Sequence, residues 1–181
     1  MRLDEAELAP FEIPDGSVPV GVSYLLKGPV GRDLTLLVAF PDGWQRTVPG
    51  HYEAAEEVVV LSGRIEIGDL VLDAGDWGFM PSGWLRTSMR TVGETVCVAR
   101  FFGPARWVRS ELAATDEDAR SCTLGGPAMK LLDWDRSTSW FGEAPDEGPP
   151  AELLDPSART WTWGEPAGSD GPFFIRTYPS P

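Results

Sequence analysis

The chain has 181 residues and a mass of 19.7 kDa, which suits one domain with room for an appendage. Hydrophobic residues make up 42% and charged residues 24%, the balance of a globular rather than a disordered protein. The formal net charge of −13 argues against nucleic acid and against anionic membrane surfaces as partners, because both attract basic proteins. The first residues lack the apolar segment of a signal peptide, so we expect a cytoplasmic protein.

The first hundred residues consist of short runs rich in β-branched and aromatic residues, separated by turns that contain glycine and proline. No segment there sustains a helical period, and this density of short strands is typical of an antiparallel sandwich or barrel. We therefore predict an all-β fold. The predicted strands cover residues 20–26, 34–40, 56–61, 64–67, 70–72, 77–80 and 95–102.

The sequence changes in character after residue 103, so we predict a barrel over 1–103 and a C-terminal extension over 104–181. Because the extension is too short and too interrupted to bury a second core unaided, we expect it to pack on the barrel or on a partner subunit. Within it, residues 107–120 are predicted as a short helix or an acidic linker, and residues 142–157 as a loop rich in proline and acidic residues. The predicted strands of the extension are 130–134, 160–163 and 173–178.

The only histidine lies in a pattern of regularly spaced glycines and acids. Gly43 is followed by five residues and then Pro49, and His51 comes two positions later. Four residues separate His51 from Glu56, and six more separate Glu56 from Gly63. A second pattern, GDWGFMPSGWLR, follows at residues 75–86.

These two patterns resemble the two motifs of the cupin superfamily, G-x5-H-x-H-x(3,4)-E-x6-G and G-x5-P-x-G-x2-H. The resemblance covers roughly half the chain. It implies a small jelly-roll-like antiparallel β-barrel that holds a ligand or a metal ion inside, here with an extended, partly irregular C-terminal arm. It also implies a homodimer, because cupins commonly pair their sheets across subunits.

Two of the four metal ligands that the resemblance implies are replaced. Pro49 stands in the place of the first histidine and Arg86 in the place of the last. Proline offers no donor atom, and the arginine guanidinium stays protonated and repels a cation by several kcal/mol at about 4 Å. We therefore predict no metal and no other cofactor. One alternative stays open: His51, Glu53 and Glu56 together suit iron or manganese, and Glu57 can replace either acid.

Without a metal, Arg86 is expected to face Glu56 across the barrel as a buried ion pair. This pair either only locks the barrel or also binds a ligand oxygen, with His51 as general acid or base and Glu56 orienting it. We favour the second interpretation and assign His51, Glu56 and Arg86 as catalytic candidates. Strand parity with Arg86 makes Trp84 a candidate to stack on a planar ligand.

Further candidates for ligand binding are Glu53, Tyr24 and Arg100, which lie on or beside predicted strands. Cys97 and Cys122 lack the spacing of a zinc site, and we expect them to be reduced packing residues.

The leading functional hypothesis is a metal-independent enzyme that binds a small, aromatic or polyketide-like molecule and catalyses isomerisation, cyclisation or dehydration by acid–base chemistry. One alternative is an iron- or manganese-dependent oxygenase that uses His51 with carboxylates. The other is a non-catalytic module that binds a small molecule.

Overall fold

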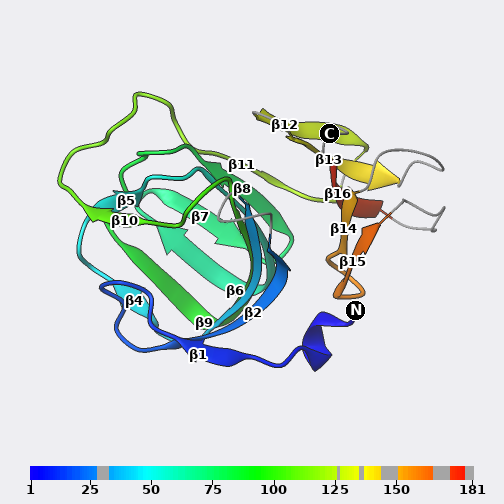
Figure 1. Ribbon diagram of the computed structural model, residues 1–181, viewed down its shortest axis with the longest axis horizontal. Helices are drawn as coiled ribbons and strands as arrows, with labels where there is room; N and C mark the ends of the chain where they lie inside the picture. Colours follow the sequence, from blue (N-terminus) through cyan, green and yellow to red (C-terminus); the bar gives the residue numbers. More distant parts are fainter. Residues whose placement is uncertain (28–32, 126, 135–136, 144–150, 165–171, 178–181) are drawn as a thin grey trace. The chain divides into compact units, whose positions relative to one another are not determined.

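A computed structural model describes residues 1–27, 33–125, 127–134, 137–143, 151–164 and 172–177 (Figure 1). Strands dominate these residues, and their one helix is a 3-10 turn, η1 (Leu3–Glu5), which confirms the predicted all-β class. None of the described segments forms a helix with the length and hydropathy needed to cross a bilayer. The chain divides into two compact units, residues 7–123 and residues 1–6 with 124–181.

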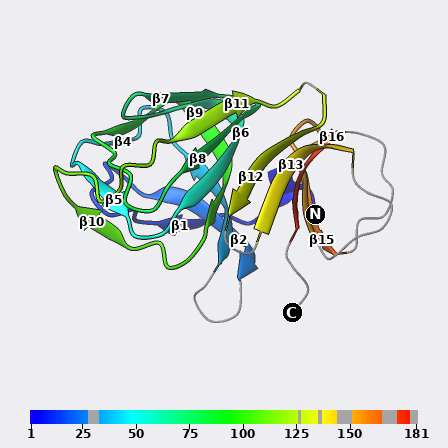
Figure 2. The ribbon, with the colours of Figure 1, turned by 90° about the horizontal axis from the view of Figure 1, so that it is seen from above.

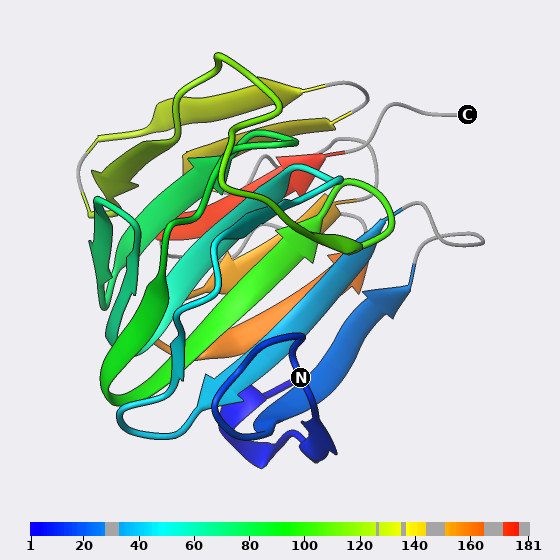
Figure 3. The ribbon, with the colours of Figure 1, turned by 90° about the vertical axis from the view of Figure 1, so that its left-hand side faces the viewer.

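The first unit is a barrel of antiparallel strands. Its large sheet has the order β1-β2-β3-β9-β6-β8-β11, with β4 added on β9 and β7 on β6, and β5 pairs separately with β10 (Figures 2 and 3). The strands are β1 (Ala9–Phe11), β2 (Val20–Lys27), β3 (Leu34–Phe40), β4 (Gln45–Arg46), β5 (Gly50–Tyr52), β6 (Glu56–Ile67), β7 (Leu70–Asp73), β8 (Asp76–Met80), β9 (Met89–Phe101), β10 (Trp107–Arg109) and β11 (Arg120–Thr123). Every strand predicted before residue 103 is present.

Alternation along the central strand β6 decides which side chains face the barrel interior. Val58 and Val60 belong to the main apolar cluster of the barrel, whereas the intervening Val59 is buried outside this cluster. Because side chains of a strand alternate between two faces, Glu56 shares the interior face with Val58 and Glu57 does not. Alternation therefore places one carboxylate of the Glu-Glu pair inside the barrel and the other outside it.

A β-bulge at Gly63 divides β6 into two halves, which pair with different strands. The register between β6 and β9 shifts on both sides of Ser62, and Gly63 has a φ of +76°. The half of β6 before this bulge pairs with β8, and the half after it pairs with β7. A glycine with positive φ inside a long strand is typical of such a bulge, which bends the strand and increases its twist.

The second unit contains its own antiparallel sheet, with the order β12-β13-β16-β14-β15. The strands are β12 (Met129–Trp134), β13 (Ser137–Glu143), β14 (Ala151–Asp155), β15 (Thr160–Gly164) and β16 (Pro172–Thr177). Ala151, Leu153 and Ile175 form a small buried cluster on one face of this sheet. The C-terminal residues are thus a sheet with its own apolar cluster rather than only an irregular arm.

Three predictions for the C-terminal half need correction. The boundary lies near residue 123 rather than 103, because β10 and β11 pair with β5 and β8 and so belong to the barrel. Residues 107–120, predicted as a short helix or an acidic linker, contain no helix: residues 107–109 form β10, residues 110–119 are irregular as a linker would be, and Arg120 begins β11. Residues 151–155, predicted as loop, form strand β14, while residues 144–150 of that predicted loop lie outside the described residues.

The bulge at Gly63 yields a prediction with a matched control. A Cβ at Gly63 would collide with Thr95 Oγ1 and lie 2.5 Å from the Glu94 carbonyl oxygen, whereas at Gly93, with a similar φ of +74°, it would meet nothing within 4 Å. We expect Gly93→Ala to lose about 1–2 kcal/mol of unfolding free energy from backbone strain alone, and Gly63→Ala about 1–3 kcal/mol more from overpacking. Urea denaturation of both variants measures the difference, and equal losses would contradict the close packing at the bulge.

Candidate active site

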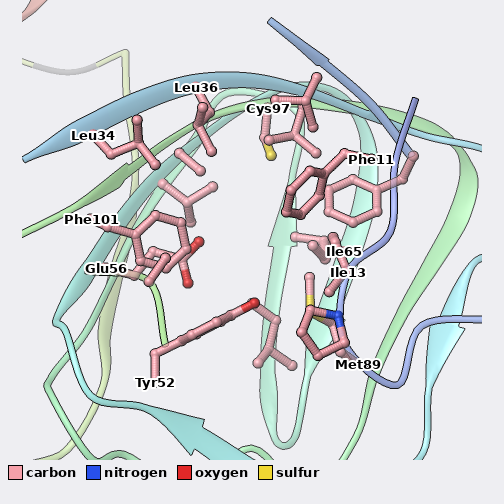
Figure 4. A pocket seen from close by; sticks show the side chains of 18 of the residues that line it. Phe11, Ile13, Leu34, Leu36, Tyr52, Glu56, Ile65, Met89, Cys97 and Phe101 are labelled. Carbon is pink, nitrogen blue, oxygen red and sulfur yellow. The ribbon is translucent and has the colours of Figure 1, made fainter. Parts of the chain in front are cut away.

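A cavity of about 200 Å³ lies inside the barrel. Figure 4 shows apolar side chains from several strands around it, including Leu34 and Leu36 of β3 and Phe101 of β9. The full apolar and sulfur-containing lining comprises Phe11, Ile13, Pro14, Val22, Leu34, Leu36, Val38, Phe40, Val58, Ile65, Ile67, Met89, Cys97, Ala99, Phe101 and Ala105. Such a lining with a few polar groups is typical of a site for a small organic ligand.

The polar end of the cavity holds an ion pair between Glu56 and Arg86. Arg86 Nη1 lies 2.7 Å from Glu56 Oε2, and the side chains are only 2% and 10% exposed, respectively. The expected contact between these residues is therefore present. Backbone hydrogen bonds between Arg86 and Gly50, in both directions, hold the arginine at the edge of β5. The Nε–H of Arg86 is buried and has no acceptor among the described residues.

Tyr52, rather than His51, presents its side chain to the cavity from β5. Figure 4 shows the Tyr52 hydroxyl and the Glu56 carboxylate both directed into the cavity. His51 is buried, does not line the cavity, and its Nδ1 has no hydrogen-bond partner within the described part of the chain. Neighbouring residues of a strand face opposite ways, so the presence of Tyr52 in the cavity excludes His51 from it. The expected place of His51 beside Glu56 is thus wrong.

The cupin motif itself contained the signal for Tyr52. The motif allows three or four residues between its second histidine and its glutamate, and the alignment above used four. With three residues there, and six instead of five after Gly43, Tyr52 takes the place of the second histidine and Gly50 that of the first. The backbone bridge between Gly50 and Arg86 supports this register, because it brings both motifs together at one point.

The alternative metal ligands do not converge. Glu53 is exposed and lies 3.5 Å from Arg106 Nε, away from the cavity. Glu57 accepts a hydrogen bond of 2.7 Å from Trp77 Nε1 on the opposite face of β6. Among the described residues no three His, Cys, Asp or Glu side chains are grouped to hold a metal ion. The predicted set of His51, Glu53 and Glu56 is therefore not assembled.

The residues that replace the cupin ligands do not fit a metal ion either. Gly50 has no side chain, and a Cβ there would collide with the Val108 carbonyl oxygen and lie 2.5 Å from the Trp107 ring. Glu56 is paired with Arg86, whose fixed positive charge opposes a cation at this point. A phenol and one paired carboxylate fall short of the three protein ligands that catalytic metal sites usually have. We therefore derive no step through a metal.

Of the remaining predicted ligand-binding residues, one lines the cavity and the others lie elsewhere. Tyr24 lines the cavity although it is 50% exposed, which places it at the opening. Trp84 packs against the barrel core but does not line the cavity, because residues 81–88 are irregular and strand parity does not apply to them. Arg100 is buried outside the cavity and pairs with Asp33 at 3.0 Å. Of the predicted ligand-binding residues, only Tyr24 lines the cavity.

A second arginine near the polar end was not anticipated. Arg46 of β4 is 1% exposed, donates to the Tyr52 hydroxyl at 3.4 Å and lies over the Trp107 ring at 3.6 Å from its centroid. Burial lowers the pKa of Arg46 below its usual range, and the nearby positive charge of Arg86 acts in the same direction. In the sequence, Arg46 falls in the variable stretch of the first motif, so no pattern marks it.

Both cysteines are unpaired. Cys97 lines the cavity, and burial, together with the negative charge of Glu56, raises the pKa of its thiol. A thiol kept protonated in this way is a poor nucleophile, so Cys97 serves as a packing residue of the cavity wall.

Hydrogen bonds to Asp15 connect one wall of the cavity, at Ile13 and Pro14, to strand β10. It accepts hydrogen bonds from Trp107 Nε1 at 3.1 Å and from Arg109 Nε at 2.9 Å, directly after the wall residues Ile13 and Pro14. Its φ of +63° is uncommon for a residue with a side chain, although aspartate and asparagine tolerate it better than most. These hydrogen bonds, called the Asp15 clamp below, hold the segment at Ile13 and Pro14 beside the cavity.

The sequence matches no known family model and no curated protein. Solved structures do match. A protein from Nostoc punctiforme described as a dioxygenase is 16% identical over 98% of this chain and 77% of its own, with a TM-score of 0.69. An acetylacetone dioxygenase from Acinetobacter johnsonii is 17% identical over 60% and 77% of the two chains, with a TM-score of 0.51.

This chain has the cupin fold. A protein from Pseudomonas aeruginosa described as glyoxylate-induced is also similar, with 11% identity over 92% of this chain and 82% of its own, and a TM-score of 0.57. Two of these alignments extend over almost the whole chain, so the cupin likeness includes residues of the second unit.

Breaking the buried pair of the cupin barrel should be far more costly than breaking an exposed one. We expect Arg86→Met to lose about 3–5 kcal/mol of unfolding free energy, because it leaves the Glu56 carboxylate buried and unpaired. Arg64→Met is the control, since Arg64 and Asp73 are also 2.7 Å apart but their side chains are 45% and 53% exposed. This control should lose less than about 1 kcal/mol. Urea denaturation gives both values, and similar losses would contradict the buried pair.

The Asp15 clamp predicts a pH-dependent stability. Hydrogen bonds from Arg109, then from Trp107, hold the pKa of Asp15 below its usual value. The clamp therefore stabilises the fold above the unfolded pKa, about 3.9, and this stabilisation is lost as pH falls through the lowered native pKa. Asp15→Asn should lower the melting temperature at pH 7 but much less at pH 2.5, whereas the exposed Asp69→Asn should change it little at either pH. An equal effect of Asp15→Asn at both values would show that the charge is not involved.

Proposed function

We propose that this cupin barrel binds a small, largely apolar organic molecule and acts on it by metal-independent acid–base chemistry at Glu56 and Arg86. The observation that carries the proposal is the buried ion pair at the polar end of an otherwise apolar cavity. A cavity of this size suits a molecule of about ten to fifteen non-hydrogen atoms. The remaining polar groups would orient one oxygen of this molecule at the pair.

The chemistry best suited to this site is the movement of a proton next to a carbonyl group. Glu56 would take a proton from the carbon beside the carbonyl and return it at another position, so that the product is an isomer of the substrate. The Arg86 Nε–H, which is buried without an acceptor among the described residues, and the Tyr52 hydroxyl, which points into the cavity, would stabilise the negative charge that develops on the carbonyl oxygen. This assignment gives Glu56 the proton-transfer role that the sequence suggested for His51. Cyclisation and dehydration would begin with the same removal of a proton. In a dehydration, protonated Glu56 would then return the proton to the departing hydroxyl group, which leaves as water.

A non-catalytic binding module remains the second candidate, because the cavity is apolar over most of its surface. The two candidates differ in one measurable property. A catalytic Glu56 must exchange a proton with a bound molecule, whereas a binding module need not.

Deuterium exchange tests the proposal without knowledge of the natural product. The purified protein is incubated in D₂O with a panel of small ketones, enones and 1,3-dicarbonyl compounds, and loss of the C–H signal is followed by proton NMR. We expect exchange of at least one compound, with Glu56→Gln slowing it by about 10²–10⁴-fold. His51→Gln is the matched control and should keep most of the rate, because His51 does not line the cavity.

Metal dependence is tested on the same assay. Exchange should survive dialysis against EDTA. Stoichiometric iron or manganese that remains bound, with exchange that depends on it, would overturn the metal-independent chemistry. Binding of panel members without any exchange would favour the non-catalytic module.

A further inference from the structure

The polar end of the cavity carries more positive than negative charge. Arg46 and Arg86 both lie over the ring of Tyr52, with their Cζ atoms 5.5 Å and 4.6 Å from its centroid. Glu56 pairs with Arg86 at 2.7 Å. No carboxylate of the described residues forms an ion pair with Arg46, although the charges of Glu56 and Asp15 act on it from further away. Its contacts are the Tyr52 hydroxyl, the Met89 sulfur at 3.6 Å and the Trp107 ring. Asp15 is paired with Arg109 and Glu56 with Arg86, so the positive charge of Arg46 leaves a net charge of about +1 among these five groups.

A buried guanidinium without a carboxylate at ion-pair distance is unfavourable, because the interior solvates it poorly. Its desolvation is visible in the lowered pKa of Arg46. Aromatic rings offset part of this loss through cation–π contacts but do not neutralise the charge. A negative charge supplied from the cavity would do so.

Two hydrogen-bond donors that have no acceptor indicate where this negative charge would lie. Arg46 donates to the Tyr52 oxygen, so the hydroxyl proton of Tyr52 is free to point elsewhere, and no acceptor for it exists among the described residues. Figure 4 shows this hydroxyl directed into the cavity. The buried Nε–H of Arg86 also lacks an acceptor in the described part of the chain. Hydrogen bonds from such donors to a charged oxygen are stronger than those to a neutral one.

We propose that the molecule bound in the cavity is an organic monoanion, a carboxylate or a stable enolate, whose charged oxygen accepts from Tyr52 and Arg86 while Arg46 supplies the balancing charge. This inference rests on the proposed function in one respect only, that the cavity binds a small molecule. Arg46 is a positioning residue here, because it acts on the ligand through the Tyr52 hydroxyl rather than by direct contact. The apolar walls receive the rest of the molecule.

Matched pairs of probes test the charge directly. Benzoate, cinnamate and hexanoate are titrated into the protein at pH 7.5 by calorimetry, each against its own neutral amide. We expect at least one carboxylate to bind more tightly than its amide by about tenfold or more, the effect of one buried charge-assisted hydrogen bond. Arg46→Gln should reduce this preference to within about threefold, and Arg46→Lys should keep part of it.

The control variant is Arg64→Gln, which removes an exposed arginine that pairs with Asp73 and does not line the cavity. It should keep the full preference for the carboxylate. Circular dichroism shows whether each variant is folded, and the comparison of acid with amide in the unmodified protein needs no variant at all.

The outcomes separate this inference from the proposed function. Equal affinity for carboxylates and amides in the unmodified protein would overturn the inference but leave ligand binding intact. No binding of any probe up to millimolar concentration would overturn both. A preference for the carboxylate that persists in a folded Arg46→Gln variant would show that Arg46 does not supply the balancing charge, and would also overturn the inference.

Discussion

The ion pair between Glu56 and Arg86 is the interaction that sets the charge and the hydrogen-bonding groups at the polar end of the cavity. In a cupin with a metal, the glutamate and three histidines neutralise and surround an ion. Here the guanidinium provides the positive charge, 2.7 Å from the carboxylate and almost fully buried. A fixed organic cation cannot change its coordination or its oxidation state, but it keeps its charge at every physiological pH and donates hydrogen bonds in fixed directions. The polar end of the cavity therefore presents a carboxylate and a guanidinium in a fixed, buried arrangement.

The aromatic residues around this ion pair connect it to the wall of the cavity. Arg46 and Arg86 both lie over the Tyr52 ring, which also contacts the rings of Phe101 and Trp107 at centroid distances of 5.0 Å and 5.2 Å. Trp107 in turn stacks on Arg46 and donates to Asp15. One connected set of contacts thus links β10 and the wall of the cavity to its charged end.

The sequence predicted the barrel well because its strands have strong local signals: runs of valine and leucine bounded by glycine turns. It also paired Glu56 with Arg86, because the motif fixes both positions. It misplaced His51 because a single residue of uncertainty in the motif reverses every side chain of a strand. Arg46 and β14 carried no pattern at all: the arginine lies in a variable stretch, and the leucines of β14 follow a segment rich in proline.

The packing around Gly50 limits which side chains this position can accept. Its missing side chain lets β10 approach so closely that any Cβ at this position would meet the backbone of Val108 and the ring of Trp107. An imidazole cannot be introduced there by one substitution, because the neighbouring strand already occupies its volume. A histidine at this position would first require the displacement of β10, so packing as well as chemistry opposes a metal ligand here.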